Sequence, residues 1–207
     1  MTEDDINKAL DSDSYYLKYK AIRDINASPA NIDKALSDED DDIKYAAIRN
    51  PNATPANIDK ALDCKDVYIR ITAIKNKNAS EDNIRKALNS SCIQCKQRAI
   101  AHENITPAII TEILLDKKMS LSFKIAAVTL SKTTEDHMLL VLSKPGNANL
   151  KVAVLKNLFV TEKVINKALS SKYLEVKLAA LNHPNATAKN KEKASRDPAI
   201  INFLLKS

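Results

Sequence analysis

An isoleucine and a leucine recur at a fixed spacing through the first half of the chain. The two series are Ile6, Ile32, Ile58, Ile84 and Ile110, and Leu10, Leu36, Leu62, Leu88 and Leu114. Each series advances by 26 residues, as does a further isoleucine series at positions 22, 48, 74 and 100. Self-similarity with a period of roughly 20–50 residues is typical of solenoids, whose units bury their apolar faces against one another. The period therefore predicts a stack of similar units rather than one centrally packed core.

Each repeat is predicted to contain two short helices. A serine or threonine recurs where the first helix should begin, and its side-chain oxygen can accept an unpaired backbone N–H of the first turn. In three repeats proline follows directly, at a position where its missing N–H is harmless. The predicted caps are Thr2, Ser28, Thr54, Ser80, Thr106, Thr134, Thr161 and Thr187.

The second helix of each repeat carries Ile43, Ala47 and Ile48, or their equivalents, on one apolar face. In the last repeat Lys191 and Ser195 replace the expected isoleucine and leucine, which predicts a polar end cap. We predict an all-α fold, a right-handed α-solenoid of about seven two-helix repeats of 26–28 residues plus a truncated C-terminal capping repeat. The repeats should start near residues 2, 28, 54, 80, 106, 134 and 161, with the cap at 187–207 and a single domain over 1–207.

An Asn-x-Ser or Asn-x-Thr turn, with alanine usually in the middle, closes most repeats. Helices often stop at a residue in the left-handed conformation, usually glycine, but this chain has one glycine. Asparagine tolerates that conformation better than most other residues. We therefore predict that these asparagines stop the second helices; the alternative is a ladder of amides that binds a ligand. They are Asn26, Asn52, Asn78, Asn104 and Asn185.

The stretch DEDDDIKYAAIRNPNATPANIDKAL resembles the leucine-rich repeat variant and HEAT-like α-solenoid families, with their pattern of roughly Asp-x-x-Val-Arg-x-x-Ala-x-x-Asn-Pro-x-Thr-Pro. The resemblance implies an interaction surface. Some HEAT-like members excise damaged bases from DNA, but their pocket motifs have no match here. The iron–sulfur segment of some variant proteins has no counterpart either, so we expect no cofactor. The matching residues are Asp40, Ile43, Lys44, Ala47, Asn50, Pro51, Thr54 and Pro55.

A basic residue holds the same place in seven successive second helices. Equivalent positions of a solenoid form a line, so these cations are a candidate binding column for a phosphate backbone or an acidic protein. The alternative is structural, with each cation paired to an acid near a helix start, as Asp40 and Asp66 would allow. The other repeats have no acid four residues before the cation. The column consists of Lys18, Lys44, Arg70, Lys96, Lys124, Lys151 and Lys177.

The repeat becomes irregular between about residues 130 and 160, where its spacing changes to 28 and then 27 residues. There Phe159 takes the place of Asn52, so that Leu158, Phe159 and Val160 form an apolar turn. An apolar turn is a candidate contact for a protein partner or for self-association. The alternative is repacking around the inserted residues.

No catalytic motif is recognisable in the sequence. Cys92 and Cys95 form a CxxC, but no second pair or suitably placed histidine completes a metal site. Cys95 aligns with core isoleucines, and His102 and His183 fall at the turn position of Asn50, which suggests polar groups at helix ends. We predict no metal, no cofactor and no enzymatic activity.

Composition and charge narrow the function further. The chain is 44% hydrophobic and 28% charged, without an apolar run near the ~20 residues that span a bilayer, so we expect a folded cytoplasmic protein with no membrane partner. Its net charge of +6 is concentrated in the last third. We predict a non-catalytic protein-binding scaffold or adaptor for an unidentified partner, acidic or extended. The alternative is nucleic-acid binding through the basic column and the basic C-terminal third.

The composition is rich in lysine, isoleucine and asparagine. Together with the near-identical polar repeats, it resembles that of bacterial and tailed-phage proteins. A regulator or inhibitor of a host protein would fit such a source.

Overall fold

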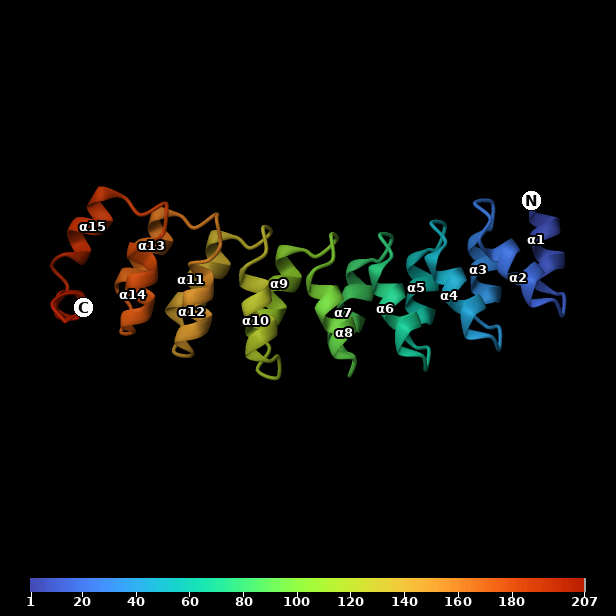
Figure 1. Ribbon diagram of the computed structural model, residues 1–207, viewed down its shortest axis with the longest axis horizontal. Helices are drawn as coiled ribbons and strands as arrows, with labels where there is room; N and C mark the ends of the chain where they lie inside the picture. Colours follow the sequence, from blue (N-terminus) through green and yellow to red (C-terminus); the bar gives the residue numbers. More distant parts are fainter. Residues whose placement is uncertain (207) are drawn as a thin grey trace. The chain divides into compact units, whose positions relative to one another are not determined.

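The computed structural model describes residues 1–206, which form sixteen α-helices in consecutive pairs and no β-strand (Figure 1). The predicted all-α fold of two-helix repeats is confirmed. The chain divides into two compact units, one from Met1 to Ile105 and one from Thr106 onward. The single domain over 1–207 stays a prediction.

The first unit contains four helix pairs. Odd-numbered helices pack on odd-numbered ones and even on even, which gives two layers with the apolar core between them. In α4, for example, Ile43, Ala47 and Ile48 are fully buried, as their spacing predicts. The helices are α1 (Glu3–Leu10), α2 (Tyr15–Ile22), α3 (Pro29–Ala35), α4 (Asp41–Arg49), α5 (Pro55–Leu62), α6 (Val67–Lys75), α7 (Glu81–Asn89) and α8 (Ile93–Ile100).

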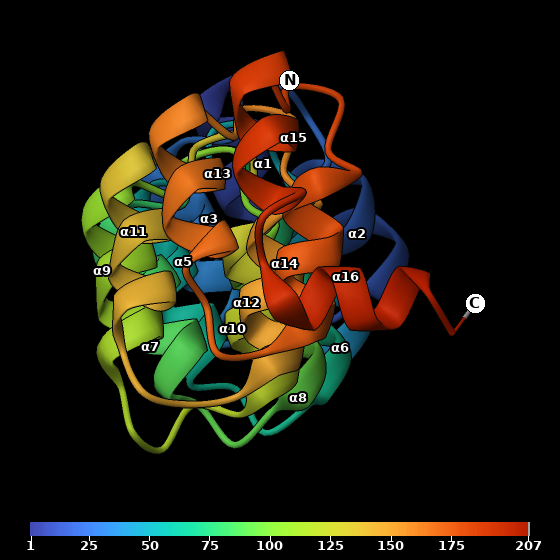
Figure 2. The ribbon, with the colours of Figure 1, turned by 90° about the vertical axis from the view of Figure 1, so that its left-hand side faces the viewer.

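The second unit repeats this arrangement. Figure 2 shows α9, α11 and α13 in one layer and α10, α12 and α14 in the other, in agreement with their packing contacts. The helices are α9 (Pro107–Leu115), α10 (Leu121–Val128), α11 (Glu135–Ser143), α12 (Ala148–Val154), α13 (Glu162–Leu169), α14 (Leu174–Leu181), α15 (Ala188–Ala194) and α16 (Pro198–Leu204).

All eight predicted serine and threonine caps begin a first helix, and each side chain accepts the backbone N–H three residues later. In four repeats an asparagine at that third position returns a hydrogen bond to the cap. Asn57, for instance, accepts the backbone N–H of Thr54 at 3.0 Å and donates to the carbonyl of Pro29 in the preceding repeat at 3.2 Å. The same side chain therefore starts one helix and holds the neighbouring one.

The C-terminal repeat is short but contains both helices. The first, α15, is polar, as predicted for a cap. The second, α16, buries Ile200 but leaves Ile201, Phe203 and Leu204 exposed, so the polar outer face does not extend to α16. None of the helices in residues 1–206 combines the length and the apolar character that crossing a membrane requires.

The prediction that the turn asparagines stop helices in the left-handed conformation is wrong. No non-glycine residue in the described part of the chain has a positive φ. Instead, the Asn52 side-chain amide donates to the carbonyls of Ile25 at 2.6 Å and Ala27 at 3.0 Å, in the turn of the preceding repeat. Asn78, Asn104 and Asn185 make the equivalent pair of bonds.

A second clamp lies two residues earlier in the same turns. The buried Asn50 amide donates to the carbonyls of Ile22 at 2.8 Å and Asp24 at 3.0 Å, while its oxygen accepts the N–H of Asn52 at 2.9 Å. Asn76 and Asn157 repeat this pattern. Buried backbone carbonyls must find hydrogen-bond donors. The asparagine amides of one repeat supply these donors to the carbonyls in the turn of the preceding repeat. They are therefore not available as a ligand-binding ladder.

Candidate interaction surfaces

Two cations of the basic column in the first unit, Lys18 and Lys44, are paired with carboxylates of that unit. The Lys18 ammonium lies 2.9 Å from the Asp38 carboxylate, and the Lys44 ammonium lies 2.7 Å from that of Asp41. These hydrogen bonds raise the pKa of both lysines. The acid that neutralises Lys18 comes from the next repeat, twenty residues along the chain. Neither acid lies four residues before its lysine: Asp38 follows Lys18 by twenty residues, and Asp41 precedes Lys44 by three.

Two further column residues are also held by their surroundings. The Arg70 guanidinium donates to the carbonyls of Cys64 and Lys65, both at 2.6 Å. In the second unit Lys177 forms an ion pair with Asp197, again twenty residues on, and this bond lowers the pKa of the Asp197 carboxyl. These side chains therefore do not form a continuous stripe of cations without partners.

Lys124 and Lys151 of the second unit have no carboxylate partner among residues 1–206, which is also true of Arg70 and Lys96 in the first unit. Lys151 is buried and donates to the carbonyl of Leu142 at 3.0 Å, and its ammonium lies 5.7 Å from the centre of the Tyr173 ring. Burial, together with the charges of Lys172 and Lys167, lowers the pKa of Lys151.

Five of the six tyrosines lie on the second helices of the first three repeats. Several are strongly exposed: Tyr15 by 48%, Tyr16 by 68% and Tyr68 by 71% of their surface. Two arginines at the ends of α2 and α4 accompany them. We call this set the tyrosine–arginine face: Tyr15, Tyr16, Tyr19, Arg23, Tyr45, Arg49 and Tyr68.

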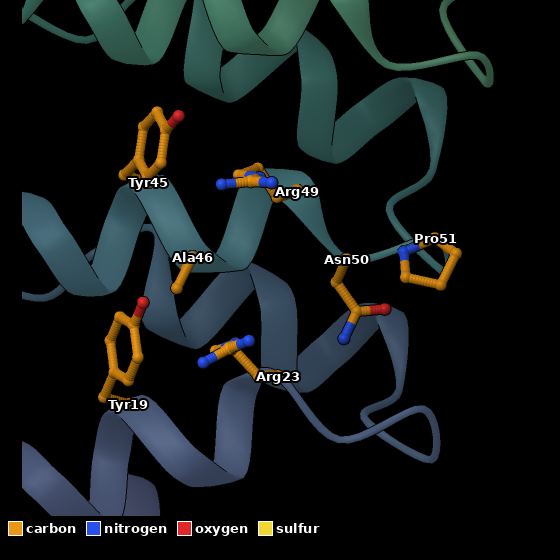
Figure 3. Close-up of a pocket in the computed structure, with 7 residues that line it drawn as sticks. All are labelled: Tyr19, Arg23, Tyr45, Ala46, Arg49, Asn50 and Pro51. Atoms are coloured by element: carbon orange, nitrogen blue, oxygen red, sulfur yellow. The ribbon is translucent and has the colours of Figure 1, made fainter.

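A pocket of about 210 Å³ lies between α2 and α4 on this face (Figure 3). The Arg23 guanidinium lies 5.3 Å from the centre of the Tyr19 ring, and the Arg49 guanidinium lies 5.5 Å from that of Tyr45. Each pair is a cation–π contact, and the two pairs are equivalent by the 26-residue repeat. Neither arginine forms an ion pair with any described residue, and both are exposed, so both guanidiniums can meet a partner.

The opposite end of the same helices is acidic. Asp38, Glu39 and Asp40 line a pocket with Tyr15 at the start of α4. Partial desolvation and the charges of Asp42 and Asp40 raise the pKa of the Tyr15 phenol. Carboxylates at one end, tyrosines along the helices and arginines at the other end make a polarised surface rather than a uniformly basic one.

Only part of the predicted apolar contact in the second unit is exposed. Leu158 is 78% exposed and Phe159 is 62% exposed, whereas Val160 is buried in the core. The backbone of this turn is held in place because Asn185 donates to the carbonyls of Leu158 at 3.4 Å and Val160 at 2.9 Å. The turn therefore presents two apolar side chains on a fixed backbone.

The cysteines have structural positions. Cys92 caps α8, with its sulfur accepting the backbone N–H of Cys95 at 3.1 Å. Cys95 is fully buried, as its alignment with core isoleucines predicts, and burial together with Cys92 raises the pKa of its thiol to about 12. Within residues 1–206 no group of three or more His, Cys, Asp or Glu side chains is placed to hold a metal ion.

The histidines also belong to the framework. His102 and His183 stand in place of Asn50, as the sequence indicates: the Nε2 atom of His102 lies 3.1 Å from the carbonyl of Asn76, and its Nδ1 atom accepts the N–H of Asn104 at 3.0 Å. An accepting Nδ1 requires the neutral tautomer with hydrogen on Nε2, which then donates to the carbonyl. His137 instead replaces the capping asparagine at the start of α11, where its Nδ1 accepts the N–H of Thr134 at 3.0 Å.

These features define an α-solenoid of helix pairs whose polar turns join successive repeats. The fold is similar to a solved structure described as a leucine-rich repeat variant with a novel repetitive structural motif, with a TM-score of 0.61. That similarity covers 97% of this chain and 79% of the other, at 13% sequence identity, and so concerns the fold alone. The predicted resemblance to the leucine-rich repeat variant is confirmed at the level of structure. No protein-family model matches the chain, and no curated protein matches it.

Sequence reasoning did not identify the tyrosine–arginine face. A signal was present, because Tyr19 and Tyr45 each follow a column lysine and Arg23 and Arg49 each follow the buried isoleucine of the second helix. Lys18 and Lys44 point to acids of their own unit, whereas Tyr19 and Tyr45, one residue later, remain partly exposed.

Proposed function

We propose that this protein is a non-catalytic scaffold that binds a protein partner through the tyrosine–arginine face. The observation that carries the proposal is the concentration of five of the six tyrosines, with two arginines free of carboxylates, on three adjacent helices. Tyrosine and arginine are enriched at protein interfaces and among the residues that dominate binding energy. The face therefore has the composition of a protein-binding surface.

The charge pattern favours a partner of opposite polarity. Arg23 and Arg49 would meet acidic side chains of the partner, while Glu39 and Asp40, which form no ion pair within the described chain, would meet basic ones. Such complementary charges fix orientation and speed encounter more than they add affinity. The exposed Leu158 and Phe159 offer a second contact in the other unit, either for the same partner or for self-association.

Nucleic-acid binding through the basic column has less support. A phosphate track requires accessible cations, and Lys18, Lys44 and Lys177 are occupied by carboxylates. The acids that rim the tyrosine–arginine face would also repel a phosphate backbone. Its arginines and tyrosines alone resemble single-strand binding platforms, so the experiment includes a nuclease arm.

The test is an affinity capture from a lysate of the source cell with the purified protein and two variants. Arg49→Glu reverses a charge on the face, and Lys189→Glu makes the matched reversal on exposed α15, outside both candidate contacts. We expect to capture a protein partner whose binding is unaffected by nuclease. The Lys189→Glu variant should capture the same amount of this partner as the unaltered protein, and the Arg49→Glu variant should capture at least tenfold less. Adding Tyr68→Ala should weaken capture further.

Two outcomes would contradict the proposal. Capture that is unchanged by both Arg49→Glu and Tyr68→Ala would exclude this face as the binding surface. Loss of all bound material after nuclease treatment, or at high salt only, would instead favour nucleic-acid binding, because phosphate contacts weaken steeply with salt. Circular dichroism of each variant checks that the helices still form.

A further inference from the structure

A pocket of about 320 Å³ lies in the second unit beside the loop that contains the single glycine. Its apolar lining includes Leu114, Met119, Leu121, Leu140 and Leu150. Ligand sites of small molecules are typically concave, mostly apolar and about 300–1,000 Å³ in volume. The pocket lies at the small end of that range.

Three lysines also line this pocket: Lys124, Lys144 and Lys151. No acidic side chain of the described chain lines it. Lys124 and Lys144 form no ion pair within residues 1–206, and the buried Lys151 has only a backbone carbonyl and an aromatic ring as partners. The pocket therefore combines an apolar wall with three positive charges and no negative one.

The repeat shows why the charge is uncompensated. Lys18 and Lys177 each find an aspartate twenty residues later, at Asp38 and Asp197. For Lys124 the same place holds Lys144, so a second cation stands where Lys18 and Lys177 have an acid. For Lys151 the place holds a serine, at position 171.

Lys151 makes this departure costly. Its side chain is 8% exposed, and burying a charge without a counter-ion is unfavourable. Burial lowers its pKa, and the neighbouring Lys172 and Lys167 add to that effect. An anion in the pocket would supply the missing counter-charge.

We propose that this pocket binds a small alkyl carboxylate. The carboxylate would lie among the three lysine ammonium groups, and the alkyl chain would lie against the leucines and Met119. Charge-assisted hydrogen bonds would hold the head group, and burial of the chain would add hydrophobic affinity. The site is independent of the tyrosine–arginine face, because it is formed entirely by residues of the second unit.

Octanoate is the first compound to test, by isothermal titration calorimetry and by amide chemical shifts in NMR spectra of the full chain. Acetate supplies the head group without the tail, and 1-octanol supplies the tail without the charge. We expect saturable one-to-one octanoate binding, with shifts confined to α10–α12 and the loops around them. Acetate and 1-octanol should each bind at least tenfold more weakly.

Variants then separate the two parts of the site. Lys124→Gln with Lys144→Gln should weaken octanoate about tenfold or more, since hydrogen bonds to a charged group are strong. Met119→Trp should block the pocket by filling it while leaving the lysines in place. Lys189→Gln, on α15, is the matched control and should bind octanoate like the unaltered protein.

Three results would overturn the proposal. The first is that octanoate does not bind at concentrations below those at which octanoate molecules associate with one another. The second is octanoate binding that acetate or 1-octanol matches. The third is equal octanoate affinity in the double lysine variant and in Lys189→Gln. The comparison of the three compounds uses the unaltered protein, so it stands even if a variant fails to fold.

Discussion

The first unit keeps the 26-residue repeat, and the second departs from it. In the first unit, turns carry both clamps, as at Asn50 with Asn52, and the column cations Lys18 and Lys44 are paired with acids. In the second unit, Phe159 occupies the place of Asn52 and makes no such clamp. The spacing of the repeat also changes in the second unit, where the column lysines Lys124 and Lys151 line a pocket that contains no acidic side chain.

This difference indicates where stability and binding are located. In a regular repeat, side chains of one turn can donate hydrogen bonds to the backbone carbonyls of the preceding turn, because equivalent positions meet at every interface. Where the register changes, those matches are lost, and side chains such as Phe159 and Lys124 become available to other molecules. Departure from a local rule without structural gain is often associated with function.

The largest expected effect on this comparison comes from removing Asn157, which is the clamp that the irregular turn retains. Asn157→Ala deletes donors to Val128 and Leu130 and an acceptor for Phe159, at 2.9–3.0 Å. We expect the free energy of unfolding of the second unit to fall by about 2–4 kcal/mol, because buried carbonyls lose their donors. Hydrogen–deuterium exchange of α11–α14 would measure it.

The matched variant in the first unit is Asn50→Ala, which deletes the same three bonds. Its effect on α2–α5 should be smaller, about 1–3 kcal/mol, because Asn52 still clamps the turn. An equal or larger loss from Asn50→Ala would contradict the view that the second clamp reinforces the first.

A gain of stability is expected when the missing clamp is restored. In Phe159→Asn the new amide would reach the carbonyls of Ser131 and Thr133, which are equivalent to those of Ile25 and Ala27. Two added hydrogen bonds should stabilise the second unit by about 1 kcal/mol. Thermal unfolding followed by circular dichroism would show it, and a lower Tm would mean that Phe159 packs better than an amide.

The two units should also differ in their response to acid. Burial lowers the pKa of His137, whose neutral ring accepts the N–H of Thr134. Because the folded pKa lies below the unfolded value of about 6.5, the contribution to stability is complete above that pH. It is lost as pH falls through the folded pKa.

His137→Asn places in α11 the residue that caps α3, α5 and α7. We expect the variant to reduce the loss of stability of the second unit between pH 7 and pH 5, with little effect on the first. Urea unfolding at several pH values, followed by exchange in each unit, would test this. An unchanged pH profile would show that His137 does not titrate in that range.

The smallest effects concern the column lysines. Lys44→Met removes a partly exposed ion pair with Asp41, for which a loss of about 0.2–1 kcal/mol is usual. Lys151→Met removes a buried cation without a carboxylate partner and should leave the second unit equally stable or more so. Urea midpoints of the two variants compare them directly, and a clear loss with Lys151→Met would show that its carbonyl bond is needed.

Much of the fold was predictable because its signals are local. The Ser28 and Thr54 caps, the isoleucine faces and the alanine positions follow from hydrogen bonding and periodicity within one repeat. The core position of Cys95 and the framework role of His102 also followed, by alignment of the repeats. The left-handed role of the asparagines was wrong because a local rule was applied to a side chain whose partners lie in the preceding repeat.

What the sequence by itself determined was the length of the repeat, the start of each first helix and the residues that face the core. The tertiary structure alone decided that Lys18 meets Asp38 from the next repeat, that Asn52 binds the turn before it, and that Lys124 and Lys144 share a pocket. Caps and amphipathic faces depend on residues within about four positions of each other. Contacts across twenty or more positions depend on how one repeat stacks on the next, and only the folded chain brings those atoms together.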